Sequence, residues 1–462
     1  MPSTLQRAPI GELWNSIQAW LFPVLEDELG ALDEMHRQFV SVCELCAPQD
    51  HMVSYQWCGN GCPPSDRLAL RKAYIAKAVW DFSTTRDVID AIRHRPVLRR
   101  LCGWETLGKV PSESTFSRAF DQFARDGRPQ AIHKALIKTH YGETLAGHIS
   151  RDATAIHARE KAEPKPKRPP EAKGGKRGRR RKDAPPAPPP EPKRLQQPLE
   201  RDPEANLADL PTVCDWGCKK NSQSKKECWR GYKLHLDVID GDIPVSAILT
   251  SASLHDSQVA IPLAQMSAER IVNLYDRADA AYDAREIREI SARLGHVPII
   301  DDNPGRGEKR EFSPAEAVRY RERSAAERVN SHLHEQHGGR HVRVRGPVKV
   351  AAHLAFGLVV IAAEQMLRML VSPRASLCCI GKAGSERREG RCVLKNGDSS
   401  PSGGQKPTRA QHPPFSLAEP LVVPGFKRVP RGVLQVPLNA YKRTHRYSGS
   451  ALPSRMSPRV SG

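Results

Sequence analysis

The chain of 462 residues has no uninterrupted hydrophobic stretch long enough to cross a membrane. Its longest apolar run, Leu354 to Ala363, is about half the length that a bilayer requires and is followed by Glu364 and Gln365. The first residues, Met1 to Gly11, are polar and lack the apolar segment of a secretion signal. We therefore predict a buried core helix around residue 358 and a cytoplasmic protein with no membrane partner.

The chain is also short of acidic residues. It has 72 Lys and Arg against 52 Asp and Glu, a net charge of +20. Such a surplus favours a polyanionic partner, either nucleic acid or an anionic membrane. Because no membrane-spanning run is present, nucleic acid is the preferred interpretation.

Cysteine is moderately common, with 11 residues, but no secretion signal accompanies it. This combination indicates reduced thiols. Four cysteines form two close pairs, and they are either ligands of a structural zinc or free buried thiols. The sequence leaves both interpretations open for Cys43, Cys46, Cys58 and Cys62.

One internal segment and the C-terminal segment have too few apolar residues to form a core. Residues 158–210 are rich in Pro and basic residues, and residues 372–462 are rich in Ser, Pro, Gly and Arg. Both compositions predict disorder. The internal insertion is interpreted as a soluble spacer that also holds DNA phosphates without reading sequence. The residues proposed for these phosphate contacts are Arg179, Arg180, Arg181 and Lys182.

Apolar periodicity divides the remainder into two regions. The first 146 residues have helical spacing throughout, which predicts a helical domain. From residue 147 onward, strand-like runs alternate with helical segments, which predicts an α/β domain with a mixed sheet. The expected strands are 149–156, 229–239, 245–249, 271–275 and 296–300.

Residues 319–334 form the most informative stretch. On one helix, with Tyr320 at zero, Arg323, Glu327 and His334 fall at about 300, 340 and 320 degrees. A phenol, a guanidinium, a carboxylate and an imidazole thus share one face, which suits an acid placed beside phosphate-binding groups. The alternative is an ordinary amphipathic surface helix. We expect a single helix from Pro314 to about residue 338.

This spacing resembles the Tyr-Arg-Glu-Lys signature of bacterial insertion-sequence transposases with a DDE catalytic domain. The resemblance implies that Glu327 is the third catalytic acid, with Tyr320 and Arg323 as DNA contacts. His334 stands where the family has Lys, which makes this DNA contact dependent on pH.

Two further motifs resemble those of the same family, in the same order. Asp152, followed by Ala-Thr, corresponds to the first acid, and Asp279, followed by x-x-Tyr-Asp, corresponds to the second. Asp276 is the rival for the second position. The pattern His255-Asp256 resembles a family motif whose Asp caps a helix, and Pro111 to Arg118 resembles part of the family's N-terminal helical domain.

The resemblance implies a DNA-end-binding domain at 1–146 and a ribonuclease H-like catalytic domain at 147–371, followed by a disordered tail at 372–462. Asp152, Asp279 and Glu327 would hold two Mg²⁺ ions, for which Mn²⁺ would substitute. The partners would be double-stranded DNA, both transposon ends and target, and a second copy of the chain, in the bacterial nucleoid. Two alternatives are a decayed or domesticated transposase that only binds DNA, and a ribonuclease H-like nuclease without strand transfer.

Overall fold

The computed structural model describes residues 10–51, 65–164, 195–220, 223, 225–303, 305 and 310–371. These residues belong to the first of two compact units, 1–384 and 385–462. The N-terminal part is helical, as predicted. Its helices are α1 (Ile10–Ser16), α2 (Phe22–Leu29), α3 (Glu34–Cys46), α4 (Arg67–Val79), α5 (Thr85–His94), α6 (Pro96–Cys102), α7 (Glu113–Arg125) and α8 (Arg128–Tyr141), with a π-helical turn at Ile17–Leu21.

Polar caps begin several of these helices. Asp33 accepts a hydrogen bond from the backbone N–H of His36 at the start of α3. Thr84 and Asp87 form a reciprocal capping box at the start of α5. These caps satisfy N–H groups that have no partner inside the helix.

The second part contains one mixed sheet in the order β4-β3-β1-β5-β6. The first three strands of this order are antiparallel, whereas β1, β5 and β6 are parallel. The prediction of a ribonuclease H-like mixed sheet is confirmed, with the first and fourth expected strands side by side. The strands are β1 (Leu145–His157), β3 (Lys226–Ile239), β4 (Ile243–Ser251), β5 (Val272–Ala278) and β6 (Val297–Ile300).

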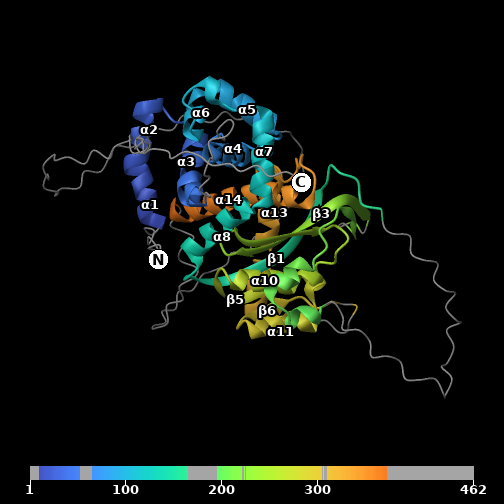
Figure 1. Ribbon diagram of the computed structural model, residues 1–462. Coiled ribbons are helices and arrows are strands. Elements are labelled where there is room, and N and C mark those ends of the chain that lie inside the picture. The colour runs from blue at the N-terminus through green and yellow to red at the C-terminus, as the bar shows by residue number, and fades with distance from the viewer. Residues whose placement is uncertain are drawn as a thin grey trace, which may run out of the picture. The chain divides into compact units, whose positions relative to one another are not determined.

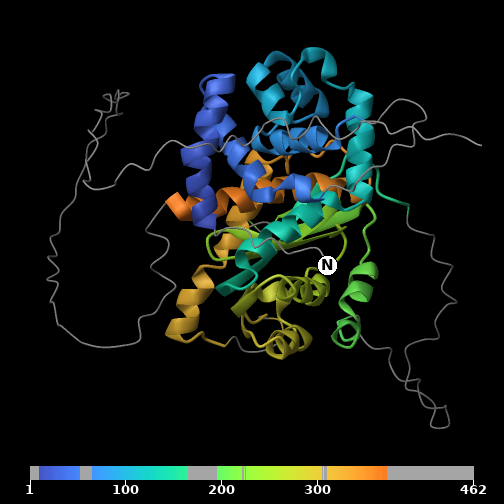
Figure 2. The same ribbon diagram turned by 60° about the vertical axis from the view of Figure 1, so that its left-hand side comes forward.

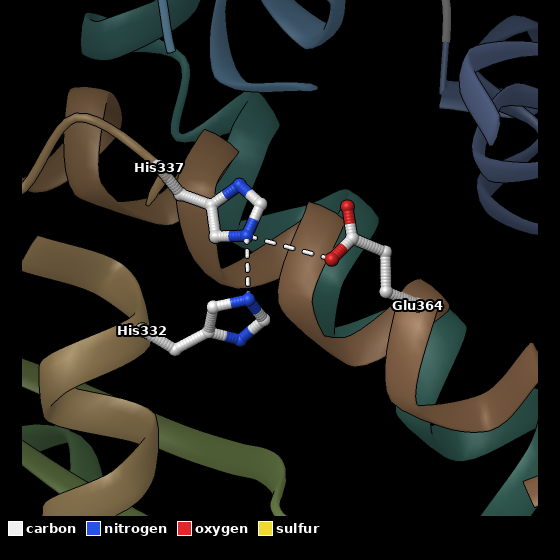
Figure 3. A group of neighbouring side chains, drawn as sticks. All are labelled: His332, His337 and Glu364. Atoms are coloured by element: carbon white, nitrogen blue, oxygen red, sulfur yellow. Dashed lines mark hydrogen bonds and ion pairs between the residues drawn. The ribbon is translucent and has the colours of Figure 1, made fainter. Parts of the chain in front are cut away.

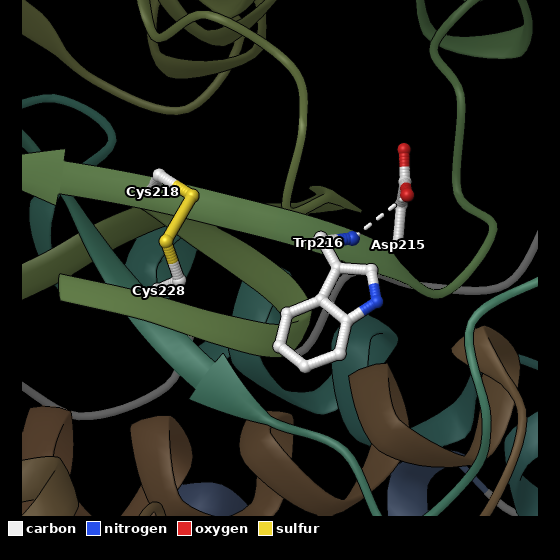
Figure 4. Close-up of a disulfide and its surroundings, with 4 residues drawn as sticks. All are labelled: Asp215, Trp216, Cys218 and Cys228. Atoms are coloured by element: carbon white, nitrogen blue, oxygen red, sulfur yellow. Dashed lines mark hydrogen bonds between the residues drawn. A yellow bond between two sulfur atoms is a disulfide. The ribbon is translucent and has the colours of Figure 1, made fainter. Parts of the chain in front are cut away.

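An additional strand, β2 (Asp215–Lys220), was not predicted. It pairs with the first part of β3, and this antiparallel register puts Cys218 opposite Cys228. The two cysteines form a disulfide (Figure 4). The prediction that all thiols are reduced is therefore wrong for this pair, because the irregular spacing of the cysteines hid the strand that brings them together.

Helices cover both faces of the sheet (Figure 1). On one face, α10 (Ser257–Ala268) packs against β3 and β4, and α11 (Arg285–Arg293) packs against α10 and β6. On the other face, α13 (Ser324–Gln336) contacts β1 and β3, and α14 (Pro347–Val371) contacts β4. The N-terminal helices lie beyond α14, as the second view also shows (Figure 2). α14 is thus the central layer between the helices and the sheet.

One hydrophobic core joins the helical part to the sheet. It includes Leu70 of α4 and Phe116 of α7 together with Ile149 of β1 and Ile239 of β3. Val359 of α14 belongs to the same core. The core therefore crosses the expected boundary at residue 146.

α14 is the buried core helix that the apolar run predicted. Residues 347–370 are long and apolar enough to cross a membrane, but 83% of the most apolar window is buried inside the protein. Such burial is typical of a core helix. No other helix in the described ranges meets the same criteria.

Some predictions fall on residues outside the described ranges. These are the phosphate-binding block Arg179 to Lys182, most of the basic insertion and the segment 372–462. Cys58 and Cys62 also lie outside, whereas Cys43 and Cys46 are buried in α3 and form no disulfide. Burial raises the pKa of the Cys43 thiol to about 12. A thiol that holds its proton is a poor zinc ligand.

Candidate active site

Asp152 and Asp279 lie at the same level of two neighbouring parallel strands. Ser150 of β1 is paired with Arg277 of β5, and each acid follows its paired residue by two positions. Neighbouring strands are about 4.8 Å apart. Asp279 is the first residue after β5, and its carboxylate accepts a hydrogen bond from the N–H of Ala281 (2.9 Å). The sheet thus brings the two predicted acids to one edge.

The third predicted acid comes from the helix that covers this edge. Glu327 lies in the first turn of α13, which packs on β1. Burial, together with the negative charges of Asp279 and Glu327, raises the pKa of Asp152 to about 6. Arg323 and the N–H of Ala153 oppose this shift. Asp152 thus lies within electrostatic range of the other two carboxylates and of Arg323.

The pKa of Asp279 is raised as well. Burial raises its pKa, and the charges of Asp256 and Glu327 add to the shift. The N–H of Ala281 and the charge of Arg323 oppose it. The site therefore holds more negative charge than its one arginine compensates, which is the condition under which divalent cations bind.

Tyr320 and Arg323 do not lie on one continuous helix with Glu327. The predicted helix is divided into α12 (Pro314–Arg321) and α13, and the prediction of a single helix is wrong. At the break, the N–H of Arg323 donates to the carbonyl of Tyr320 (3.0 Å), an i to i+3 bond that tightens the chain. A straight helical wheel therefore does not apply across Glu322.

Arg323 still contacts both of its expected neighbours. Its Nη2 forms an ion pair with Glu327 Oε1 (2.9 Å), and its guanidinium lies 5.7 Å from the centre of the Tyr320 ring. Burial opposes the charged form, but Glu327, Tyr320, Asp152 and Asp279 together raise the pKa of Arg323. Arg323 is thus a permanent cation next to the three acids.

His334 lies in the last turn of α13 and faces the sheet. Its Nε2 lies 3.0 Å from Thr154 Oγ1. Burial lowers the pKa of His334, and the nearby charges of Arg340, His157 and Lys219 lower it further. The imidazole is therefore neutral at neutral pH, unlike the Lys that the resemblance places here.

Asp276, the rival for the second acid, is buried in the sheet. β5 continues through it to Ala278, so Asp276 is not at the strand end as expected. Its carboxylate accepts from Ser291 Oγ (2.7 Å) and Asn273 Nδ2 (3.0 Å), and it pairs with His296 Nδ1 (3.2 Å). These contacts make Asp276 a structural residue.

The expectation for Asp256 needs a correction. It precedes α10, but its side chain makes no capping hydrogen bond. Instead, its carboxylate accepts from Lys233 Nζ (2.8 Å), because β3 presents this lysine to the start of α10. The His255 imidazole lies 2.8 Å from Ser257 Oγ.

Two positioning residues were missed by the sequence analysis. Asn330 donates from Nδ2 to Asp152 Oδ2 (3.1 Å). Arg277, fully buried, donates to the carbonyl of Arg319 (3.1 Å) and to Asp240 Oδ1 (3.1 Å), and so fixes the last turn of α12 to β5. Asn330 falls at about 280 degrees on the helical wheel used for His334, and this spacing was the available signal. Nothing in the local sequence indicated the role of Arg277.

A basic groove lies between the N-terminal helices and the segment from Arg340 to Gly346. It has a volume of about 760 Å³, and four Arg and two Lys are among the residues that line it. These side chains come from helices, from the end of β1 and from the basic segment. They are Lys77, Arg86, Arg159, Arg343, Arg345 and Lys349.

Comparison with known protein families matches two parts of the chain. Residues 27–122 match the family described as "Transposase domain (DUF772)", and residues 208–362 match "Transposase DDE domain". Comparison with curated proteins gave no significant match. The second match includes Asp279 and Glu327, whereas Asp152 lies between the two matched ranges. The two family matches agree with the strand order of the sheet. The chain therefore belongs to the insertion-sequence transposases with a DDE domain.

Proposed function

We propose that this transposase binds the ends of its insertion sequence as a homodimer and catalyses metal-dependent DNA cleavage and strand transfer. The observation that carries the proposal is the convergence of Asp152, Asp279 and Glu327 beside Arg323. The two neighbouring strands and α13 hold these groups rigidly, as a catalytic site requires.

The donor set fits Mg²⁺, with Mn²⁺ as a substitute. Carboxylate oxygens are hard ligands, and the raised pKa of Asp152 is consistent with negative charge that awaits a cation. Asp152, Asp279 and Glu327 would hold two ions. Bound there, the ions would promote deprotonation of an attacking water or DNA 3′-hydroxyl and neutralise charge on the phosphodiester.

The remaining residues bind and orient the DNA. Arg323 would donate two parallel hydrogen bonds to a phosphate at the cleavage site. The Tyr320 ring packs against this guanidinium and limits its orientations. Asn330 holds the Asp152 carboxylate in place. Neutral His334 would donate one hydrogen bond to a phosphate without adding charge.

DNA outside the cleavage site would bind through basic surface. The groove lined by Arg86, Arg343 and Arg345 is continuous with the segment that follows α13. Arg179 to Lys182 would add phosphate contacts that do not depend on base sequence.

The test is a nicking and joining assay with Mg²⁺, end-containing DNA and a target plasmid. We expect Asp152→Asn, Asp279→Asn and Glu327→Gln each to abolish cleavage and leave DNA binding intact or slightly tighter. Each amide keeps the shape of the side chain but removes one metal-binding charge. The losses should be non-additive, because the acids act as a unit.

Glu335→Gln is the matched control, since Glu335 is exposed on the same helix and pairs with Arg340 (3.4 Å). Asp276→Asn should lower the melting temperature but leave cleavage measurable below it. DNA binding without nicking by the wild type would favour a decayed transposase, and nicking without joining would favour a simple nuclease. Nicking by all three amide variants would refute the assignment of the acids.

A further inference from the structure

A second cluster of metal-binding side chains lies at the opposite end of α13 from Glu327. Nε2 of His337 is 3.4 Å from Nε2 of His332 and 3.5 Å from Oε2 of Glu364 on α14. The three ligand atoms all lie within 4.8 Å of one another (Figure 3). His337 is buried, and His332 and Glu364 are partly buried. Within the described ranges it is the one such group of His, Cys, Asp or Glu.

Two of the three distances match the edges of a zinc coordination sphere, and the third, between His332 and Glu364, is within 4.8 Å. Zn²⁺ binds imidazole nitrogen and carboxylate oxygen at about 2.0–2.1 Å in tetrahedral geometry, so neighbouring ligand atoms are about 3.3 Å apart. The two measured separations are within a few tenths of an ångström of this value. Three ligands leave one position, which water or the side-chain oxygen of Gln336, 2.7 Å from His332 Nε2, would fill.

The surrounding hydrogen bonds orient the ligands toward a common point. His337 Nδ1 lies 3.0 Å from the carbonyl oxygen of Ala78 in α4, so Nδ1 carries the proton and Nε2 presents its lone pair. Gln38 of α3 donates to the other carboxylate oxygen of Glu364. This arrangement, in which His337 and Glu364 are each fixed by a further partner, is typical of metal sites.

The alternative is an ion pair between a protonated His337 and Glu364. That pair would satisfy the carboxylate, and His332 Nε2 would then donate to Gln336 Oε1 (2.7 Å) instead of binding a metal. A single divalent cation satisfies all three groups at once.

We propose that His332, His337 and Glu364 form a structural Zn²⁺ site. The ion would join the C-terminal end of α13 to α14 and, through Ala78 and Gln38, to the N-terminal helices. Because the first turn of α13 carries Glu327, the zinc would fix the helix that supplies the third acid. It is separate from the Mg²⁺ site in location and in ligand type, since imidazole suits Zn²⁺ and carboxylates suit Mg²⁺.

The experiment uses the full-length protein, stripped of metal with a chelator and then titrated with Zn²⁺ in excess Mg²⁺, so that the catalytic acids are already occupied. Bound zinc per chain and the melting temperature are measured without DNA, so the result is independent of transposition activity. We expect zinc to raise the melting temperature of the wild type by several degrees, because it binds only the folded state.

The variants His332→Gln and Glu364→Gln should each bind one zinc ion per chain fewer than the wild type. Zinc should also no longer raise their melting temperature. His332 is half-buried at the edge of the cluster, so His332→Gln should fold. Glu364→Gln keeps an oxygen for the hydrogen bond from Gln38. His94→Gln, at an exposed histidine of α5, is the control and should behave as the wild type.

Co²⁺ loading identifies the ligand type. A spectrum with ligand-field bands and no thiolate charge-transfer band is expected, and it should disappear in His332→Gln. A thiolate band would place the bound ion at cysteines. That result, or equal zinc binding and equal stabilisation in the wild type and both variants, would overturn the proposal.

Discussion

The raised pKa of Asp152 means that its negative charge is unfavourable in the folded, metal-free protein. A buried carboxylate next to two others is held in the ionised form only at a cost in stability, which metal binding offsets. Arg323 reduces this cost but also forms an ion pair with Glu327. Two predictions at the scale of single residues follow from these charges.

Asp152→Asn should stabilise the metal-free protein in a pH-dependent way. The folded pKa of Asp152 is about 6 against an ordinary 3.8, so the stability that this group contributes is complete below pH 4 and is lost as pH rises through 6. The amide does not titrate. The variant should therefore gain at most about 3 kcal/mol over the wild type at pH 7.5, and nearly nothing at pH 4.

Melting curves of both proteins at the two pH values, in chelator, measure this difference. Adding Mg²⁺ at pH 7.5 should raise the melting temperature of the wild type more than that of Asp152→Asn. If the wild type and Asp152→Asn differ in stability by the same amount at both pH values, the pKa of the Asp152 carboxylate is not raised.

His334→Gln should leave the salt dependence of DNA binding unchanged at pH 7.5. The imidazole is neutral there, because burial and the nearby charges of Arg340, His157 and Lys219 lower its pKa. Binding constants measured over a range of salt concentrations give the number of ionic contacts. Arg323→Gln, which removes a permanent cation, serves as the comparison. It should reduce the slope of log binding constant against log salt concentration by about one. An equal reduction in His334→Gln would mean that His334 is protonated on DNA.

At the scale of the elements, the strands were largely predictable and the connections between helices were not. Alternating apolar residues identified the β3–β4 hairpin, and the strand–helix–strand pattern identified β5, α11 and β6. β2 was missed because Lys219, Lys220 and the exposed Trp216 break the alternation. The break between α12 and α13 was missed because Glu and Arg favour helices; it accompanies the bond from Arg277 to the Arg319 carbonyl, a tertiary contact.

The crossing of α13 and α14 depends on one glycine. A Cβ added to Gly357 would lie 2.7 Å from the carbonyl oxygen of His337 and 2.7 Å from Leu333 Cδ1. Gly357→Ala should therefore destabilise the protein by about 1–3 kcal/mol, because a backbone atom must move. Thermal unfolding measures the effect.

Gly108→Ala is the control for this substitution, since a Cβ there meets nothing within 4 Å. It should leave the melting temperature within about a degree of the wild type. An unchanged melting temperature in Gly357→Ala would show that the two helices can separate freely.

At the scale of the whole molecule, the last described helix completes the core. α14 contacts α3, α4, α7 and α8 as well as β4 and α13. Removing residues 373–462 should leave the melting temperature and DNA nicking unchanged, because apolar periodicity ends near Leu370 and the matched family range ends at residue 362. A chain ending at residue 346, without α14, should not fold. A large fall in melting temperature on removing 373–462 would show that this segment packs on the core.

The fold was predictable where one motif sets both sequence and structure. Asp279 and Glu327 lie in the family-matched segment 208–362, and β1, which carries Asp152, lies beside β5, as a ribonuclease H-like order requires. The shared core was not predictable, because helical periodicity shows which face is buried but not what covers it. The zinc cluster was hidden for a related reason: Glu364 is 27 residues from His337, and only the packing of α14 brings them together.

The position of α14 in the chain also affects how the protein is made. About 230 residues separate the end of α8 from the end of α14, so synthesis of this interval takes on the order of ten to fifty seconds. During this time the N-terminal helices are outside the ribosome without the helix that completes their core. A copy of the gene interrupted before residue 347 would therefore yield an unstable product for degradation. It would not yield a truncated protein that occupies transposon ends and inhibits the intact transposase.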